Sequence, residues 1–84
     1  MVYQVVIPKK VQKEIDKIPQ NYKIKILAAL TVLENDPYLG KKLEGKYMGY
    51  WSYRAWPYRI IYEIIKQKLR VLVVHISHRQ RAYR

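Results

Sequence analysis

Hydrophobic positions in the first half of the chain change from the spacing of a β-strand to that of α-helices. Residues 2–7 are Val, Ile or Tyr at all but one position, which predicts a strand. From Pro8 onward, apolar residues recur at i, i+4 and i+7 and predict a helix that ends before Pro19. The same spacing predicts a second helix over residues 21–36, because Pro37 disfavours helical backbone at the residue before it. The two helices form an antiparallel hairpin.

The second half reads as an irregular segment followed by a series of strands. Residues 37–49 contain all three glycines and admit one short strand at 42–44. Val, Ile, Tyr and Trp are then concentrated in three predicted strands, at 50–55, 58–65 and 70–77. The order β-α-α-β-β-β predicts an α+β fold of two layers. An antiparallel sheet would pack one face on the helical hairpin and turn the other face to solvent or a ligand.

Length and composition narrow the class of protein. A chain of 84 residues is too short for two cores, so we expect one domain over residues 1–84. The absence of cysteine excludes disulfides and thiol catalysis, and with only two histidines we expect no protein-built metal site and no cofactor. No apolar stretch approaches the roughly 20 residues of a membrane helix, and the N-terminus does not resemble a signal peptide. We therefore expect a soluble cytosolic protein that does not bind membranes.

The charge indicates a polyanionic partner. Seventeen Lys and Arg against six Asp and Glu give a net charge of +11, which favours nucleic acid or an acidic protein. The two cations are segregated: residues 1–42 hold eight Lys and no Arg, whereas residues 43–84 hold all six Arg. Arginine binds phosphate through a rigid fork of donors. The second half is therefore expected to make the specific phosphate contacts. In the alternative interpretation, the positive charge reflects only a lysine-rich surface exposed to solvent, without a polyanionic partner.

Two arginines flank the predicted turn between the second and third strands. A loop at Trp56-Pro57 places Arg54 directly opposite Arg59 on one face of the sheet. Like charges in this position destabilise a sheet, and a phosphate between them would reverse the sign of the interaction. In the alternative interpretation, both side chains splay into water.

The next predicted hairpin places the two histidines. A turn at residues 66–69 puts Arg59 opposite Ile76, and His78 then falls on the same face as the two arginines, beside the cationic tail. The same register turns His75 toward the helices as a core or semi-buried residue. A slip of one residue would invert both assignments.

The residue types limit the chemistry. The chain offers no carboxylate pair and no phosphate-binding loop of the GxxxxGK[ST] kind. Phosphate binding and metal-free cleavage of RNA remain, because RNA carries its own nucleophile in the 2′-hydroxyl. Such cleavage needs a base, cations at the phosphate and an acid for the leaving oxygen, which His, Tyr and Arg can supply.

Three motifs resemble the RelE/ParE toxin superfamily. Residues 49–64 resemble its pattern G-x-W-x-x-R-x-x-x-Y-R-[IV]-x-Y-x-[IV], residues 78–84 resemble its ending H-R-x-x-x-Y-R, and residues 43–45 resemble its L-x-G. The resemblance implies a toxin of a type II toxin–antitoxin pair. Its RelE branch cleaves mRNA in the ribosomal A site without metal, by attack of the 2′-hydroxyl. The implied partners are the ribosome, mRNA and an acidic, RelB-like antitoxin.

The resemblance also implies roles for individual residues. Arg59 and Arg79 would stabilise charge on the scissile phosphate, Tyr83 would stack on or orient the base, and His78 would be a general acid or base. Further candidate RNA contacts are Arg54, Arg81, Ser52 and Lys46.

One departure and two alternatives accompany this assignment. Some RelE enzymes carry two lysines on the strand where this chain has Ser52 and Arg54. This departure leaves His78 as the candidate base by elimination, with Glu63 as a more distant alternative. One alternative is a ParE-like toxin that inhibits DNA gyrase, and that branch lacks the terminal His and Tyr. The other is a non-catalytic module that binds RNA or the ribosome.

Overall fold

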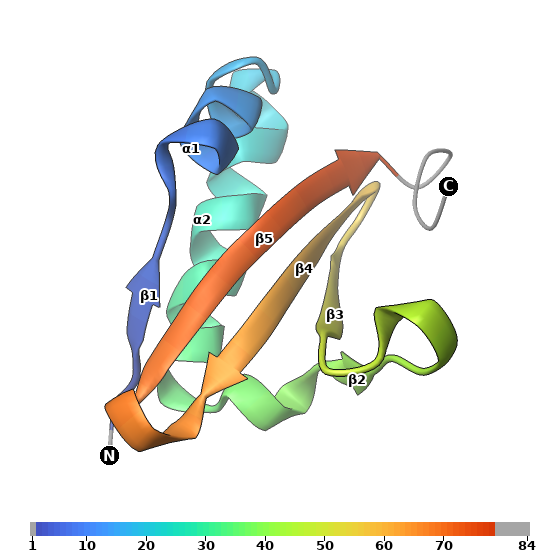
Figure 1. Ribbon diagram of the computed structural model, residues 1–84. Coiled ribbons are helices and arrows are strands. Elements are labelled where there is room, and N and C mark those ends of the chain that lie inside the picture. Colours follow the sequence, from blue (N-terminus) through green and yellow to red (C-terminus); the bar gives the residue numbers. More distant parts are fainter. Residues whose placement is uncertain (1, 79–84) are drawn as a thin grey trace.

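The computed structural model describes residues 2–78 of the chain. Its helices and strands follow the predicted order (Figure 1). They are β1 (Gln4–Val6), α1 (Lys9–Asp16), α2 (Gln20–Asn35), β2 (Lys41–Lys42), β3 (Trp51–Ala55), β4 (Tyr58–Ile65) and β5 (Arg70–His78). Three single 3₁₀ turns connect them: η1 (Pro37–Leu39), η2 (Gly45–Tyr47) and η3 (Lys66–Lys68). The short strand predicted at 42–44 lies at 41–42 instead.

The five strands form one mixed sheet in the order β1-β5-β4-β3-β2. The prediction of an α+β, two-layer fold is confirmed, and strands β2 to β5 are antiparallel as expected. The prediction of a wholly antiparallel sheet is wrong, because β1 pairs parallel with β5. The helical hairpin carries the chain from β1 to the far edge of the sheet, and the meander then returns to lie beside β1 (Figure 1).

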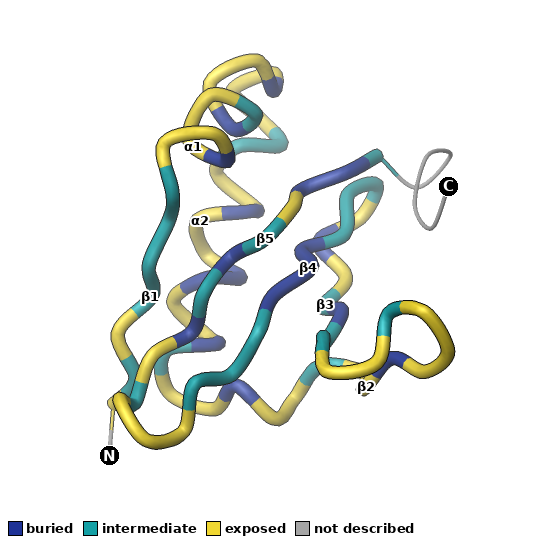
Figure 2. The backbone as a smooth tube through the Cα atoms, in the orientation of Figure 1, coloured by how far each residue is buried: buried dark blue, intermediate teal, exposed yellow. Residues whose placement is uncertain are grey.

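The core lies between the helices and one face of the sheet. In Figure 2 the buried positions gather near the middle of β4 and recur at helical spacing on α2. The side chains that are less than 2% exposed include Val11, Ile15, Ile26, Leu33, Ile60, Tyr62, Val71 and Val73. Burying one large aliphatic side chain contributes about 1.5–3 kcal/mol, so this cluster holds the two layers together. Neither described helix is both long and apolar enough to cross a membrane.

A β-bulge in β5 divides the β4–β5 ladder into two registers. Residues 62–65 pair with 70–73 in the predicted register, but Ile61 pairs with His75, which leaves Val74 as the extra residue. A bulge opposes two residues on one strand to one on its partner and turns the strand. The next core residue after Val73 is therefore Ile76, and His75 points away from the core. The prediction that His75 is a core or semi-buried residue is wrong, because its side chain is exposed.

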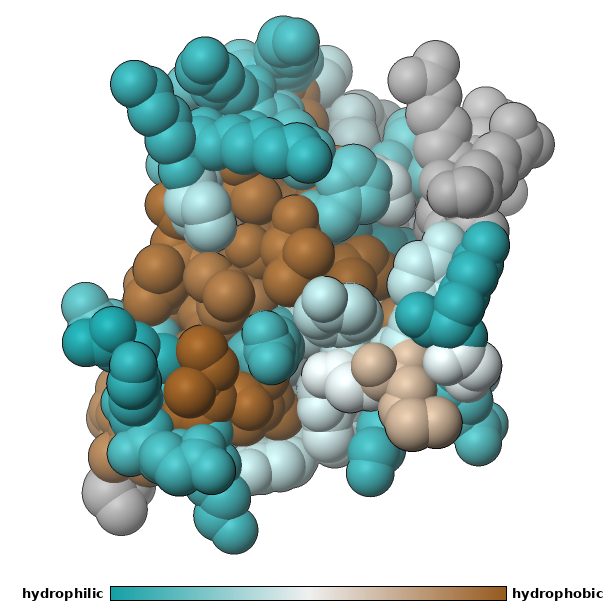
Figure 3. Space-filling view, viewed as in Figure 1, coloured by the Kyte–Doolittle hydropathy of each residue, from teal (hydrophilic) through white to brown (hydrophobic). Residues whose placement is uncertain are grey.

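The outward face of the sheet carries a contiguous apolar area. Strand alternation and the pairing of β1, β4 and β5 place five half-buried or buried aliphatic side chains there. Figure 3 views this face and shows the hydrophobic area over β1 and β5, bordered by polar side chains. We call it the apolar sheet patch; it consists of Val6, Ile61, Ile65, Leu72 and Val74.

Candidate functional site

The β3–β4 hairpin places two arginines side by side. Arg54 pairs directly with Arg59, as predicted from the turn at residues 56–57. Arg54 is exposed and Arg59 is half-buried, and both belong to the outward face of the sheet. Ser52 precedes Arg54 by two residues on the same face and is only 8% exposed. The hairpin therefore presents two cations beside a buried serine.

A cavity of about 360 Å³ lies over this part of the sheet. Both arginines line it, together with Ser52 and with Lys41 of β2. Lys41 is the residue paired with Ser52 across β2 and β3, so alternation puts it on the same face. Three cations from three strands thus surround one cavity, and an anion bound there would relieve their mutual repulsion. The remaining lining residues are Leu39, Gly40 and Tyr53.

Lys41 is the functional candidate that sequence reasoning missed. The short strand was predicted one residue too late, which left Lys41 outside it. Pairing between β2 and β3 spans an irregular loop, so neither turn chemistry nor periodicity fixes the partner of Lys41. The available signal was the Lys41-Lys42 pair itself, in which alternation directs one of the two side chains to each face.

A buried tyrosine fixes the segment that leads to β2. The Tyr62 hydroxyl donates a hydrogen bond to the Pro37 carbonyl over 2.6 Å, and both residues are buried. Burial raises the pKa of Tyr62 to about 12, against a smaller opposing effect of a hydrogen bond from the Gly40 backbone. Tyr62 therefore stays protonated at neutral pH and remains a donor. The Asp36 carboxylate caps the same turn by accepting from the Tyr38 amide over 3.1 Å.

Gly40 allows this segment to approach the sheet closely. A Cβ at Gly40 would overlap the Tyr62 hydroxyl and would lie 2.9 Å from the Ser52 carbonyl oxygen. The backbone of Gly40 is extended, with φ −73° and ψ −178°, so the glycine is required for space and not for its dihedral angles. The contact brings the chain directly alongside β3, where Lys41 begins β2.

The structure separates His78 from the arginine pair. Because of the bulge, Arg59 pairs with Ser77 and not with Ile76, and His78 pairs with Tyr58. The His78 ring lies edge-on to the Tyr58 ring, with centroids 5.4 Å apart, and Tyr58 in turn contacts Tyr22 of α2 at 5.8 Å. His78 is therefore on the helical side of the sheet. The prediction that it shares a face with Arg54 and Arg59 is wrong, because one inserted residue reverses every assignment beyond it.

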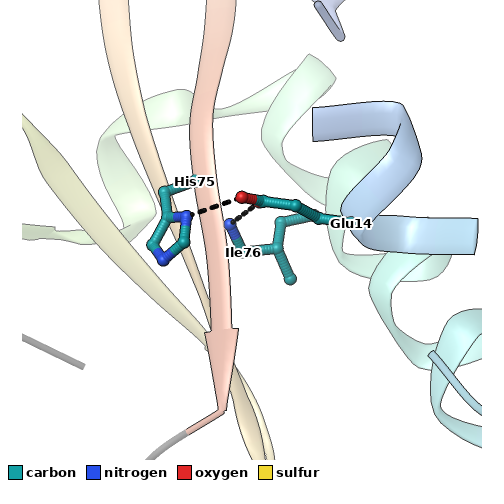
Figure 4. A network of polar contacts seen from close by, with 3 residues as sticks. All are labelled: Glu14, His75 and Ile76. Atoms are coloured by element: carbon teal, nitrogen blue, oxygen red, sulfur yellow. Dashed lines mark hydrogen bonds and ion pairs between the residues drawn. The ribbon is translucent and has the colours of Figure 1, made fainter. Parts of the chain in front are cut away.

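His78 lines a second cavity, at the end of β5 next to α1. Figure 4 shows the polar network at this edge. One carboxylate oxygen of Glu14 accepts from the Ile76 amide over 3.0 Å, and the other lies 3.0 Å from His75 Nδ1. Strand β1 pairs with residues 70–72 of β5. Further toward the C-terminal end of β5, the Glu14 carboxylate accepts a backbone hydrogen bond that a neighbouring strand would otherwise accept. The His75 side chain is 50% exposed beside it.

A buried hydroxyl lies opposite Arg59. Ser77 is only 6% exposed, and within residues 2–78 its Oγ has no hydrogen-bond partner. Leaving a buried hydroxyl unsatisfied costs about 1–3 kcal/mol. Ser77 therefore adds a polar atom beside the arginine pair at the expense of stability.

Of the remaining predicted site residues, only Lys46 lies within the described part of the chain. Lys46 is exposed on η2, where its ammonium lies 5.6 Å from the centre of the Tyr47 ring, and it does not line the Arg54–Arg59 cavity. Arg79, Arg81 and Tyr83 lie outside the described residues.

Solved toxin structures share this fold. The toxin–antitoxin complex RelBE2 from Mycobacterium tuberculosis matches with a TM-score of 0.86 and 24% identity, over 93% of this chain and 99% of that one. The archaeal RelE–RelB complex from Pyrococcus horikoshii matches with a TM-score of 0.82 and 28% identity, over 98% and 100%. The intact E. coli RelBE complex matches with a TM-score of 0.76 and 18% identity, over 90% and 95%. The fold is therefore that of the RelE-like toxins.

The family follows from the sequence. A family model described as the ParE toxin of the type II toxin–antitoxin system parDE matches residues 5–83. The chain belongs to this family, within the RelE/ParE superfamily of type II toxins, and the resemblance inferred from its motifs is confirmed. Comparison with curated proteins gave no match.

Proposed function

We propose that this toxin is a ribosome-dependent, metal-independent endoribonuclease that cleaves mRNA in the A site. The observation that carries the proposal is the Arg54–Arg59 pair beside Lys41 and Ser52 around one cavity. The 2′-hydroxyl oxygen attacks phosphorus in line and the bond to the 5′-oxygen breaks, leaving a 2′,3′-cyclic phosphate and a 5′-hydroxyl. A base removes the 2′-hydroxyl proton, an acid protonates the 5′-oxygen, and Arg59 and Arg54 stabilise the charge on the phosphate between them.

The proposed proton transfer involves His78, the neighbour of Ser77, which pairs with Arg59 near the C-terminal end of β5. We propose His78 as the general acid or base and Arg79 as a second phosphate ligand. Tyr83 would stack on a nucleobase of the RNA, and Arg81 would contact the RNA backbone. Because His78 lies on the helical side of the sheet, this assignment requires the RNA to cross the end of β5 from the Arg54–Arg59 cavity. Stacking of Tyr83 on a base would hold the nucleotide in that position.

Arg59→Ala tests the phosphate role. Loss of one positioned cation at such a transition state costs about 2.7–4 kcal/mol, or a hundredfold or more in rate. Primer extension on translated mRNA, with purified toxin and ribosomes, should show codon-spaced cuts for the wild type and a loss of at least that size for Arg59→Ala. Arg70→Ala is the matched control, because Arg70 is an exposed arginine at the opposite end of β5. Equal cleavage by both variants would remove Arg59 from the mechanism.

His78→Gln tests the proton-transfer role. Histidine changes its charge near neutral pH, so a catalytic histidine shapes the pH dependence of the rate. Single-turnover cleavage on preformed ribosome complexes, measured across pH, should show a slower rate and an altered profile with ribosome binding retained. An unchanged rate and profile would make His78 a structural residue at the strand end and place the base elsewhere.

A second candidate function is inhibition of DNA gyrase without chemistry. The match to the ParE toxin model favours it. Induced expression separates the two functions: a ribonuclease stops translation first, whereas a gyrase inhibitor stops DNA replication first. Purified toxin should leave gyrase supercoiling unaffected if the ribonuclease proposal is right. Ribosome binding without cuts would instead indicate a binding module.

We also propose an acidic antitoxin as partner, seated on the apolar sheet patch. The net charge of +11 favours an acidic chain, and the structural neighbours include toxin–antitoxin complexes. The patch shares a sheet face with the arginine pair, so one partner segment would cover both. Leu72→Glu should weaken capture of the acidic protein encoded beside the toxin, whereas Ile24→Glu on the exposed side of α2 should not. The opposite pattern would place the partner on the helices.

A further inference from the structure

The Arg54–Arg59 cavity has a third cation, contributed by the edge strand. Lys41 pairs with Ser52, two residues before Arg54, and lines the same cavity. Strand residues advance by about 3.3 Å and neighbouring strands lie about 4.8 Å apart. The Cα atom of Lys41 therefore lies one strand over from Arg54 and about 7 Å further along the sheet. The cations form a row that runs obliquely across β4, β3 and β2.

The side chains around Lys41 keep this row open. Ser52 is short and buried, and Gly40 has no side chain, so neither fills the space between Lys41 and the arginines. The packing of Gly40 against Tyr62 fixes the backbone from which Lys41 projects. A row of cations along an open cavity is suited to a chain of phosphates, whereas a compact cluster is suited to a single anion.

We propose that Lys41 binds the RNA backbone at the phosphate next to the one held by Arg54 and Arg59. Lys41 is then a positioning residue: it holds the strand so that the scissile phosphate stays between the arginines. The inference rests on the proposed function, because it takes the polyanion to be single-stranded RNA.

The adjacent lysine supplies a matched control. Lys42 pairs with Trp51, so its side chain belongs to the other face of the sheet, and it does not line the cavity. Both lysines are exposed, and replacing either with glutamine removes one positive charge. Lys41→Arg keeps the charge and serves as the rescue variant. Thermal melts of all three variants check that the fold is retained.

The experiment measures binding separately from cleavage. The probe is a short single-stranded RNA in which 2′-O-methyl groups block cleavage, bound to the free toxin and followed by fluorescence anisotropy over a range of salt concentrations. Lys41→Gln should weaken binding about three- to tenfold at low salt, as expected for one exposed charged contact. It should also reduce the slope of log K against log salt by about 0.7, the value for one phosphate on a single strand. Lys42→Gln should change neither quantity appreciably, and Lys41→Arg should restore both.

Each outcome decides the inference. Equal losses of affinity for Lys41→Gln and Lys42→Gln would show that the lysines act only through the general positive potential of the surface, and would overturn the inference. The inference would also be overturned if neither variant lost affinity, or if the wild type did not bind the RNA. The ribosome assay is independent of this result. A selective effect of Lys41→Gln without ribosomal cleavage would support the phosphate contact and reject the proposed function. Ribosomal cleavage that responds equally to Lys41→Gln and Lys42→Gln would support the proposed function and reject the phosphate contact of Lys41.

Discussion

Removing the hydroxyl of Tyr62 should loosen the turn that carries Lys41. In Tyr62→Phe, the Pro37 carbonyl loses a donor at 2.6 Å in a buried site. Leaving a buried acceptor unsatisfied costs about 1–3 kcal/mol, so the free energy of unfolding should fall by that amount. The ring still fills its place in the core, so no cavity adds to this loss.

Gly40→Ala perturbs the same contact from the other side. The added methyl group would overlap the Tyr62 hydroxyl and lie 2.9 Å from the Ser52 carbonyl oxygen and 3.1 Å from the Tyr62 ring. Overpacking of this kind costs about 1–3 kcal/mol. In the double variant the hydroxyl is gone, so its overlap with the methyl group is relieved. The double variant should therefore be more stable than the sum of the two losses predicts, by about 1 kcal/mol.

Urea unfolding of the wild type, the two single variants and the double variant measures this coupling. Additivity within about 0.5 kcal/mol would refute the close contact between Gly40 and the hydroxyl. The Gly40→Ala variant should also bind the 2′-O-methyl RNA more weakly than the wild type, because the displaced segment carries Lys41. Unchanged RNA binding in a folded Gly40→Ala variant would contradict that link.

Three further predictions concern stability. Glu14→Ala should lower the free energy of unfolding by about 1–2 kcal/mol, because it leaves the amide of Ile76 without its acceptor. Glu14→Gln should lower it less, because the glutamine keeps an acceptor oxygen. Equal losses for the two variants in urea unfolding would contradict this prediction. Ser77→Ala should leave thermal stability unchanged or raise it by about 1 kcal/mol, since the buried hydroxyl has no partner within residues 2–78; a clear loss would show that the hydroxyl is satisfied. Because the pKa of Tyr62 is raised from 10.0 to about 12, its contribution is full below pH 10 and is lost as pH rises toward 12; the stability difference between the wild type and Tyr62→Phe should shrink over that interval.

Local patterns in the sequence were enough to predict the helices, the strands and the pairing of Arg54 with Arg59. Apolar spacing and prolines placed both helices to within about two residues at most ends, and β-branched and aromatic runs placed the strands. The pairing of Arg54 with Arg59 followed from the turn at residues 56–57, because a tight turn between two strands fixes their register locally. The motifs around this hairpin were sufficient to identify the superfamily.

Features that depend on partners far apart in the chain emerge only when the sheet is assembled. The parallel pairing of β1 with β5 joins the two ends of the described chain, and the pairing of Lys41 with Ser52 spans an irregular loop. The bulge at Val74 has no local signal in glycine or proline, yet it moves His78 to the opposite face from Arg59. Side chains alternate with a period of two, so one inserted residue reverses every assignment beyond it, and only the packed sheet shows where the insertion falls.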